Sequence, residues 1–117
     1  MIRVFFGENI EEKSLTMQVK GHAGHGVIGS DIVCSAVSIL TYTVAQIFKT
    51  MEQGDAFKSP AVIRLDRGDG QISALCLDSD GYAEARKAML FAKTGFRLLE
   101  AAYPENVTLV EAEKAFK

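Results

Sequence analysis

Gly21-His22-Ala23-Gly24-His25-Gly26-Val27-Ile28-Gly29-Ser30-Asp31-Ile32-Val33-Cys34 is the stretch in which the chain passes from predicted strands to a long predicted helix. Its repeated glycines are typical of a loop. Ser30 is suited to the N-cap of the helix, and Asp31 places a negative charge in the first turn, where the helix dipole favours it. A candidate base, His22, and a candidate nucleophile, Cys34, therefore lie on opposite sides of one strand-to-helix connection.

Two strands are predicted before this stretch. Residues Ile2 to Phe6 are rich in aromatic and β-branched side chains and are followed by turn residues. From Ser14 to Lys20 apolar and polar residues alternate, which is typical of a strand with one solvated face in an antiparallel sheet. A hairpin is the simplest connection between them.

A helix is predicted from Ser30 to about Gln53, where Gly54 supplies a stop. Because the first half of this helix is apolar on most sides, we expect it to be central and well covered. Its predicted inner stripe consists of Val33, Ala36, Val37, Leu40, Val44, Ile47, Phe48 and Met51.

The second half of the chain repeats this order of elements. A second hairpin is predicted from Ala61–Asp66 and Gln71–Leu77, with a turn at residues 67–70. A second helix from about Tyr82 to Tyr103 ends before Pro104, and a last strand covers about Asn106 to Ala112. The order ββαββαβ indicates a single α+β domain over residues 1–117, with a mainly antiparallel sheet packed against two helices.

Composition narrows the classes of function. The net charge is -2 with both signs scattered, so no basic surface predicts direct binding of nucleic acid. We expect no membrane span, because no apolar run looks long and charge-free enough. Cys34 and Cys76 follow no disulfide framework, which favours free thiols in a reducing cytoplasm, and Cys76 is read as a core residue of its strand.

The chemistry predicted for the strand-to-helix connection is that of a cysteine nucleophile. The start of a helix and a neighbouring imidazolium both favour the reactive thiolate. Helical spacing puts Ser30, Asp31 and Ser38 on the same face as Cys34, in a helix that is otherwise apolar. A buried structural cysteine is the plainer alternative, but the polar stripe and the preceding His22 favour a catalytic pair.

Three other interpretations of these residues stay open. Gly24-His25-Gly26-Val27-Ile28-Gly29 fits the dinucleotide-binding pattern G-x-G-x-x-G, although the alternating strand before it and Asp31 at the helix start are unfavourable. A zinc site from His22, His25, Asp31 and Cys34 would depend on a loop of poor geometry. The loop could also be a plain turn in an interaction module.

Gly21-His22-Ala23-Gly24 followed by Gly29-x-Asp31-Ile32-Val33-Cys34-x-Ala36-Val37-Ser38 resembles the ribosomal-processing cysteine protease family Prp. The resemblance implies that His22 and Cys34 form the catalytic pair, supported by Asp31, with Gly21 and Ser38 as further motif positions. It also implies a cytoplasmic homodimer that removes the N-terminal extension of a large-subunit ribosomal protein.

From these residues we expect acyl transfer that needs no cofactor or metal, with backbone N–H groups at the helix start meeting the oxyanion. The segment Gly24, His25, Gly26, Val27 and Ile28 is expected to contact substrate. A non-enzymatic peptide-binding module of ribosome assembly is the alternative.

Overall fold

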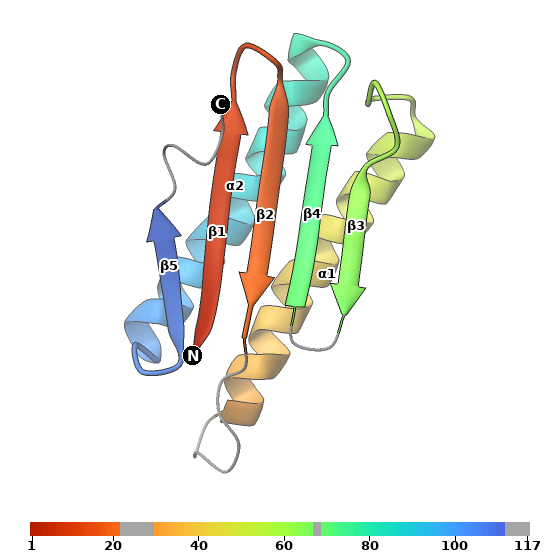
Figure 1. The fold of residues 1–117 in the computed structure, drawn as a ribbon. Helices are drawn as coiled ribbons and strands as arrows, with labels where there is room; N and C mark the ends of the chain where they lie inside the picture. Colours follow the sequence, from red (N-terminus) through yellow and green to blue (C-terminus); the bar gives the residue numbers. More distant parts are fainter. Residues whose placement is uncertain (22–29, 67–68, 112–117) are drawn as a thin grey trace.

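Strands and helices follow one another in the predicted order ββαββαβ in the computed structural model, which describes residues 1–21, 30–66 and 69–111 (Figure 1). The elements are β1 (Ile2–Asn9), β2 (Ser14–Lys20), α1 (Ser30–Gln53), β3 (Val62–Asp66), β4 (Asp69–Leu75), α2 (Ser79–Ala102) and β5 (Val107–Glu111). The predicted α+β class is confirmed.

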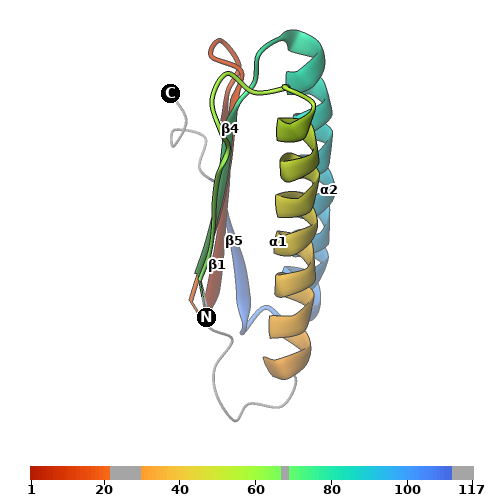
Figure 2. The ribbon, with the colours of Figure 1, turned by 90° about the vertical axis from the view of Figure 1, so that its right-hand side faces the viewer.

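The strands form one five-stranded sheet in the order β3-β4-β2-β1-β5. All pairs are antiparallel except β1 with β5, which is parallel. Figure 2 shows both helices on one face of the sheet, and none of the other described elements lies over the opposite face. Alternation produces this arrangement, since Leu15, Met17 and Val19 of β2 are buried and the polar residues between them are not.

The hydrophobic core lies between the sheet and the helices. The predicted stripe of α1 is largely confirmed, with Val33, Val37, Val44, Phe48 and Met51 buried. The predicted stripe of α2 is confirmed as well, because each of its members is buried or packs against the core. These are Tyr82, Ala85, Met89, Ala92, Phe96, Leu99 and Tyr103.

Several element ends differ from the prediction. β1 continues to Asn9 rather than Phe6, because its pairing with β2 extends to Ser14. α2 begins at Ser79, before the predicted Tyr82, because the Asp78 side chain caps it by accepting a hydrogen bond of 2.8 Å from the Gly81 N–H. β4 starts at Asp69, so the predicted turn is shortened, and Cys76 forms only an isolated bridge to Phe57.

The C-terminus of α1 is closed by a Schellman motif. The Ala56 N–H donates to the Met51 carbonyl at 3.1 Å, and the Asp55 N–H donates to the Glu52 carbonyl at 3.0 Å. The left-handed residue is Asp55, with φ of 60°, rather than the predicted stop Gly54. Asp tolerates this conformation because its short polar side chain can hydrogen-bond locally.

The outer side of α1 is more exposed than the sequence predicted. Ile47, expected on the inner stripe, is exposed, as are Ile32, Ile39 and Tyr42. The expectation that no apolar run is long and charge-free enough to span a membrane was also wrong by length and composition, because residues 32–53 contain an 18-residue window with a mean hydropathy of 1.5. Core helices pass the same test, and the packing of Val44 and Phe48 on the sheet accounts for the inner side of this one.

Candidate active site

Cys34 is an exposed free thiol on α1. Because the helix begins at Ser30, Cys34 is its fifth residue and lies just beyond the first turn. Ser38 follows one turn later and is exposed as well, so the predicted polar stripe continues along this side of the helix. The structure therefore presents the predicted nucleophile to solvent instead of burying it.

Gly21, the motif residue before His22, holds a conformation that requires glycine. Its φ is +98°, and a Cβ built there would lie 2.3 Å from the Met1 carbonyl oxygen. Its N–H donates to the Asp69 Oδ1 atom over 3.2 Å. The end of β2 is thus held between the N-terminal residue and the beginning of β4.

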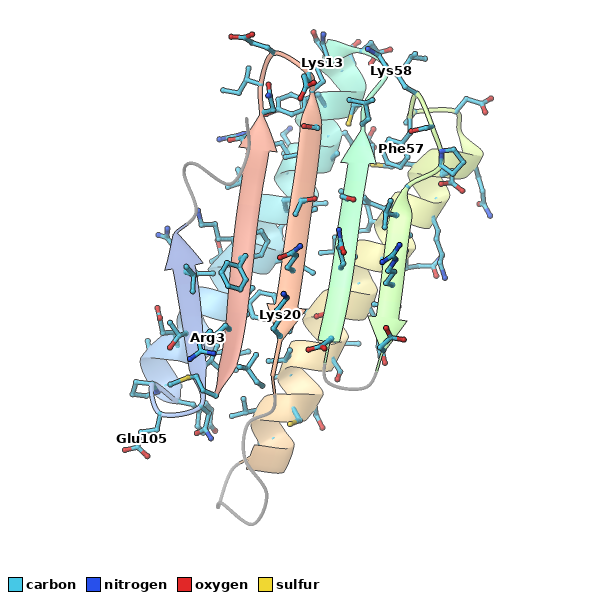
Figure 3. The ribbon with its side chains drawn as sticks, in the orientation of Figure 1. Arg3, Lys13, Lys20, Phe57, Lys58 and Glu105 are labelled. Atoms are coloured by element: carbon cyan, nitrogen blue, oxygen red, sulfur yellow. The ribbon has the colours of Figure 1, made fainter. Side chains whose placement is uncertain are left out.

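A pocket of about 480 Å³ brings Cys34, Ser38 and Gly21 together. It lies where the end of β2 and the β3–β4 hairpin meet the first half of α1. Figure 3 labels Lys20 at this end of β2, next to Gly21 in the chain. The pocket is lined by Ile2, Val19, Gly21, Cys34, Val37, Ser38, Thr41, Tyr42, Leu65, Asp66, Asp69 and Gly70.

Glycine at position 70 shapes the contact between the hairpin and the helix. A Cβ at Gly70 would lie 3.3 Å from the Thr41 Cγ2 atom, tighter than ordinary contact. The Thr41 hydroxyl donates to the Val37 carbonyl at 2.8 Å, which leaves its methyl group facing Gly70. The apolar side chains of Val19, Val37 and Leu65 make the pocket suited to an apolar group next to the thiol.

Other predicted site residues lie outside the described part of the chain. They include His22 and the expected substrate segment from Gly24 to Ile28. Asp31 belongs to the first turn of α1, but the position of its side chain is not described. Among the described residues, no group of three or more His, Cys, Asp or Glu side chains could hold a metal. The expectation of no metal at His22, His25, Asp31 and Cys34 stays untested, because of these four side chains only that of Cys34 is described.

The pocket also contains residues that sequence reasoning missed. Thr41 and Tyr42 continue the helical spacing from Cys34 and Ser38, so the polar stripe could have been extended to them. Asp66 and Asp69 were assigned only to the predicted second hairpin. Asp69 lies beside Gly21 because β2 pairs with β4, and Asp66 is opposite Asp69 in the β3–β4 hairpin. No local sequence pattern predicts these pairings.

Cys76 is fully buried, which confirms its predicted place in the core. Burial raises the pKa of its thiol, and the nearby Asp78 carboxylate raises it further. Both effects disfavour the thiolate form. Of the two cysteines, only Cys34 has the exposure that a nucleophile requires.

The comparison with protein families agrees with this geometry. The model of the family described as cysteine protease Prp matches residues 1–108. The chain belongs to this family. Prp members are cysteine proteases, and the exposed thiol on the pocket wall is the group that such an enzyme requires.

Solved structures share the Prp fold. An essential ribosomal processing protease Prp from S. aureus, in complex with a covalently linked product peptide, is 24% identical, with a TM-score of 0.71 and coverage of 95% of this chain and 99% of that chain. SMU.848 from Streptococcus mutans is 23% identical, with a TM-score of 0.69 and coverage of 95% and 93%. The S. aureus protease in complex with a substrate peptide is also 23% identical, with a TM-score of 0.69 and coverage of 95% and 99%. No curated protein sequence matches the chain significantly.

Proposed function

We propose that the protein is a cysteine endopeptidase that removes the N-terminal extension of a large-subunit ribosomal protein, with Cys34 as nucleophile and His22 as base. The observation that carries the proposal is the exposed Cys34 thiol on the wall of a pocket in a chain of the Prp family. The names of the structural neighbours, which are ribosomal processing proteases, support the class of substrate.

In the proposed reaction His22 takes the proton of the Cys34 thiol, and the sulfur attacks the scissile carbonyl carbon. The tetrahedral intermediate collapses to a thioester, and His22 returns the proton to the departing amine. Water then attacks the thioester with His22 again as base, which releases the shortened acid product and restores the thiol. Asp31 orients His22, and the segment from Gly24 to Ile28 contacts the substrate.

Backbone donors near the helix start fit the oxyanion formed in this reaction. An α-helix leaves its first N–H groups without partners inside the helix, and α1 begins at Ser30. Since Cys34 lies just beyond that turn, the unpaired N–H groups come from residues that precede it. They stabilise negative charge without a change in protonation. Ser38 offers a hydroxyl one turn further along the pocket wall.

Cleavage of the extended ribosomal protein by purified variants tests the proposal. We expect Cys34→Ala and His22→Ala each to abolish the shortened product in mass spectra. Cys34→Ala should leave thermal unfolding almost unchanged, because the side chain is exposed. The matched control is Cys76→Ser, which should cleave while losing stability, since it buries a hydroxyl. Binding of the extended protein without any product from the wild type would favour the peptide-binding module instead.

We further propose that the protein acts as a homodimer in the cytoplasm, where ribosomal proteins are made. Apolar side chains on the outer side of the helical layer support self-association: Phe91 is 81% exposed, Leu98 68% and Ile39 63%. Figure 2 shows α1 and α2 side by side, with no described strand or helix over their outer side. The helices pack closely because Gly95 of α2 makes room for Leu40, whose Cδ2 atom would lie only 2.8 Å from a Cβ there.

A further inference from the structure

The hydrogen bond between Asp69 and Gly21 joins two parts of the chain that lie 48 residues apart. Asp69 is the first residue of β4 and lies opposite Lys20, the last residue of β2. Its carboxylate reaches past this register position to accept the N–H of Gly21, the next residue along the chain. The bond therefore holds the point at which the chain leaves the sheet towards His22.

Gly21 has little freedom to move around this bond. On one side the Met1 carbonyl oxygen fills the space that a Cβ would occupy, and on the other the Asp69 carboxylate accepts its N–H. Its positive φ directs the chain out of the strand. Since His22 follows by one peptide bond, the orientation of the Gly21 peptide sets the point and direction from which the His22 backbone starts.

We infer that Asp69 is a positioning residue for the protease reaction, acting through Gly21 on His22. The inference rests on the proposed catalytic pair of His22 and Cys34. Asp69 borders the same pocket as Cys34. Through its hydrogen bond to Gly21, its carboxylate links the pocket wall to the residue that precedes His22. Its contribution is the acceptor oxygen rather than the charge.

Asp66 provides a matched control for this role. Asp66 and Asp69 are cross-strand partners at the end of the β3–β4 hairpin, and both border the pocket. Replacing either residue removes one member of the same pair of like charges. Only the replacement of Asp69 removes the acceptor for the Gly21 N–H.

The experiment measures kcat and KM on the ribosomal extension peptide for Asp69→Ala, Asp69→Asn, Asp69→Glu and Asp66→Ala. Asn keeps an oxygen acceptor at the same position, whereas Glu keeps the charge but moves the carboxylate outward by one methylene. We expect Asp69→Ala and Asp69→Glu to lower kcat by roughly 3- to 10-fold, as the loss of one ordinary hydrogen bond would. Asp69→Asn should stay within about 2-fold of the wild type. Asp66→Ala keeps the acceptor for the Gly21 N–H and should lower kcat less than Asp69→Ala does. If Asp69→Ala does not fold, Asp69→Glu decides alone.

Alkylation of Cys34 by iodoacetamide across pH provides a second readout. Removing a nearby carboxylate by itself favours the thiolate, so a pure charge effect would make Cys34 react faster in Asp69→Ala, Asp69→Asn and Asp66→Ala alike. Loss of a positioned His22 acts in the opposite direction and should slow the alkylation of Cys34 at neutral pH in Asp69→Ala and Asp69→Glu, but not in Asp69→Asn or Asp66→Ala. Among the described residues, Asp66, Asp69 and Tyr42 are the other titratable groups that border the pocket.

The outcomes separate this inference from the proposed function. If His22→Ala changes neither cleavage nor alkylation, the catalytic pair itself is wrong and the role of Asp69 fails with it. If His22→Ala abolishes cleavage but Asp69→Ala and Asp69→Asn behave alike, the catalytic pair stands and the positioning role of Asp69 is overturned. A fall in kcat that is larger in Asp69→Ala and Asp69→Glu than in Asp69→Asn and Asp66→Ala supports it.

Discussion

Gly21 combines a positive φ with a close backbone neighbour, so this position requires glycine. A side chain there would meet a left-handed backbone and the Met1 carbonyl oxygen at once. We therefore expect Gly21→Ala to lower the free energy of unfolding by about 1–3 kcal/mol, the usual cost of a strained backbone position. Urea unfolding monitored by circular dichroism measures it.

Gly54→Ala is the control for this substitution. Gly54 lies after the end of α1, where a Cβ would make only ordinary contacts, the nearest at 3.5 Å from the Met51 carbonyl oxygen. We expect the free energy of unfolding of Gly54→Ala to stay within about 0.5 kcal/mol of the wild-type value. Equal losses for the two alanine variants would show that the contact with Met1 does not restrict position 21.

The identity of the nucleophile could be predicted at the residue scale, whereas its surroundings could not. Cys34 and Ser38 share a helix face through spacing alone, and the structure places both on one pocket wall. The contact of Asp69 with Gly21 could not be predicted, because the two residues lie 48 positions apart and only the pairing of β2 with β4 brings them together. Helical periodicity is a local signal, while strand pairing depends on the whole sheet.

At the scale of elements, a polar cluster joins β1 to α2. Tyr82 donates its hydroxyl proton to Glu8, and the Arg86 Nε atom lies 3.0 Å from the same carboxylate oxygen. Burial and the bond to Glu8 raise the pKa of Tyr82 to about 12. Burial alone would raise the pKa of Glu8, but hydrogen bonds from Tyr82 and Arg86 outweigh it and lower that pKa.

These shifts predict how stability changes with pH. Tyrosine in the unfolded chain has a pKa of about 10. The contribution of Tyr82 to the free energy of unfolding is therefore complete below about pH 10 and is lost as pH rises towards 12. Glu8 stabilises the folded state above its unfolded pKa of about 4.3. This contribution to the free energy of unfolding is lost as pH falls below that value.

We expect Tyr82→Phe to lower the free energy of unfolding by about 1 kcal/mol at neutral pH. The fall of this free energy between about pH 10 and 12 should become smaller in the variant. The measurement is urea unfolding at a series of pH values. Tyr103→Phe is the control, because Tyr103 packs against the same core but does not belong to the cluster of Glu8, Tyr82 and Arg86. An unchanged alkaline decline in Tyr82→Phe would assign the decline to other groups.

The boundaries of elements were harder to predict than their existence. The amphipathic stripe located α2 correctly, but its start depended on the Asp78 side chain, which caps the helix before the first apolar position. β1 was predicted too short because its last residues are polar or glycine, yet they pair with β2 as far as Asn9. Apolar patterns mark buried faces, whereas caps and backbone pairing decide where an element ends.

At the scale of the whole molecule, none of the described elements covers the outer side of the helical layer. If two copies associate there, as proposed, Phe91→Glu or Leu98→Glu should give a monomer, because a charge in an apolar interface is costly. Size-exclusion chromatography with light scattering measures the mass. Ile10→Glu is the control, since Ile10 is 70% exposed but lies at the turn after β1. Dimers that persist in both helix variants would place the interface elsewhere.

The parallel pairing of β1 with β5 brings the first strand against the last. The Ile2 N–H donates to the Asn106 carbonyl at 2.7 Å, and Ile2 also forms part of the pocket wall beside Cys34. A chain made from its N-terminus cannot form this bond until residue 106 has left the ribosomal exit tunnel. A partly synthesised copy without β5 therefore lacks the support for one wall of its pocket, so the surroundings of Cys34 are completed only after β5 has been made.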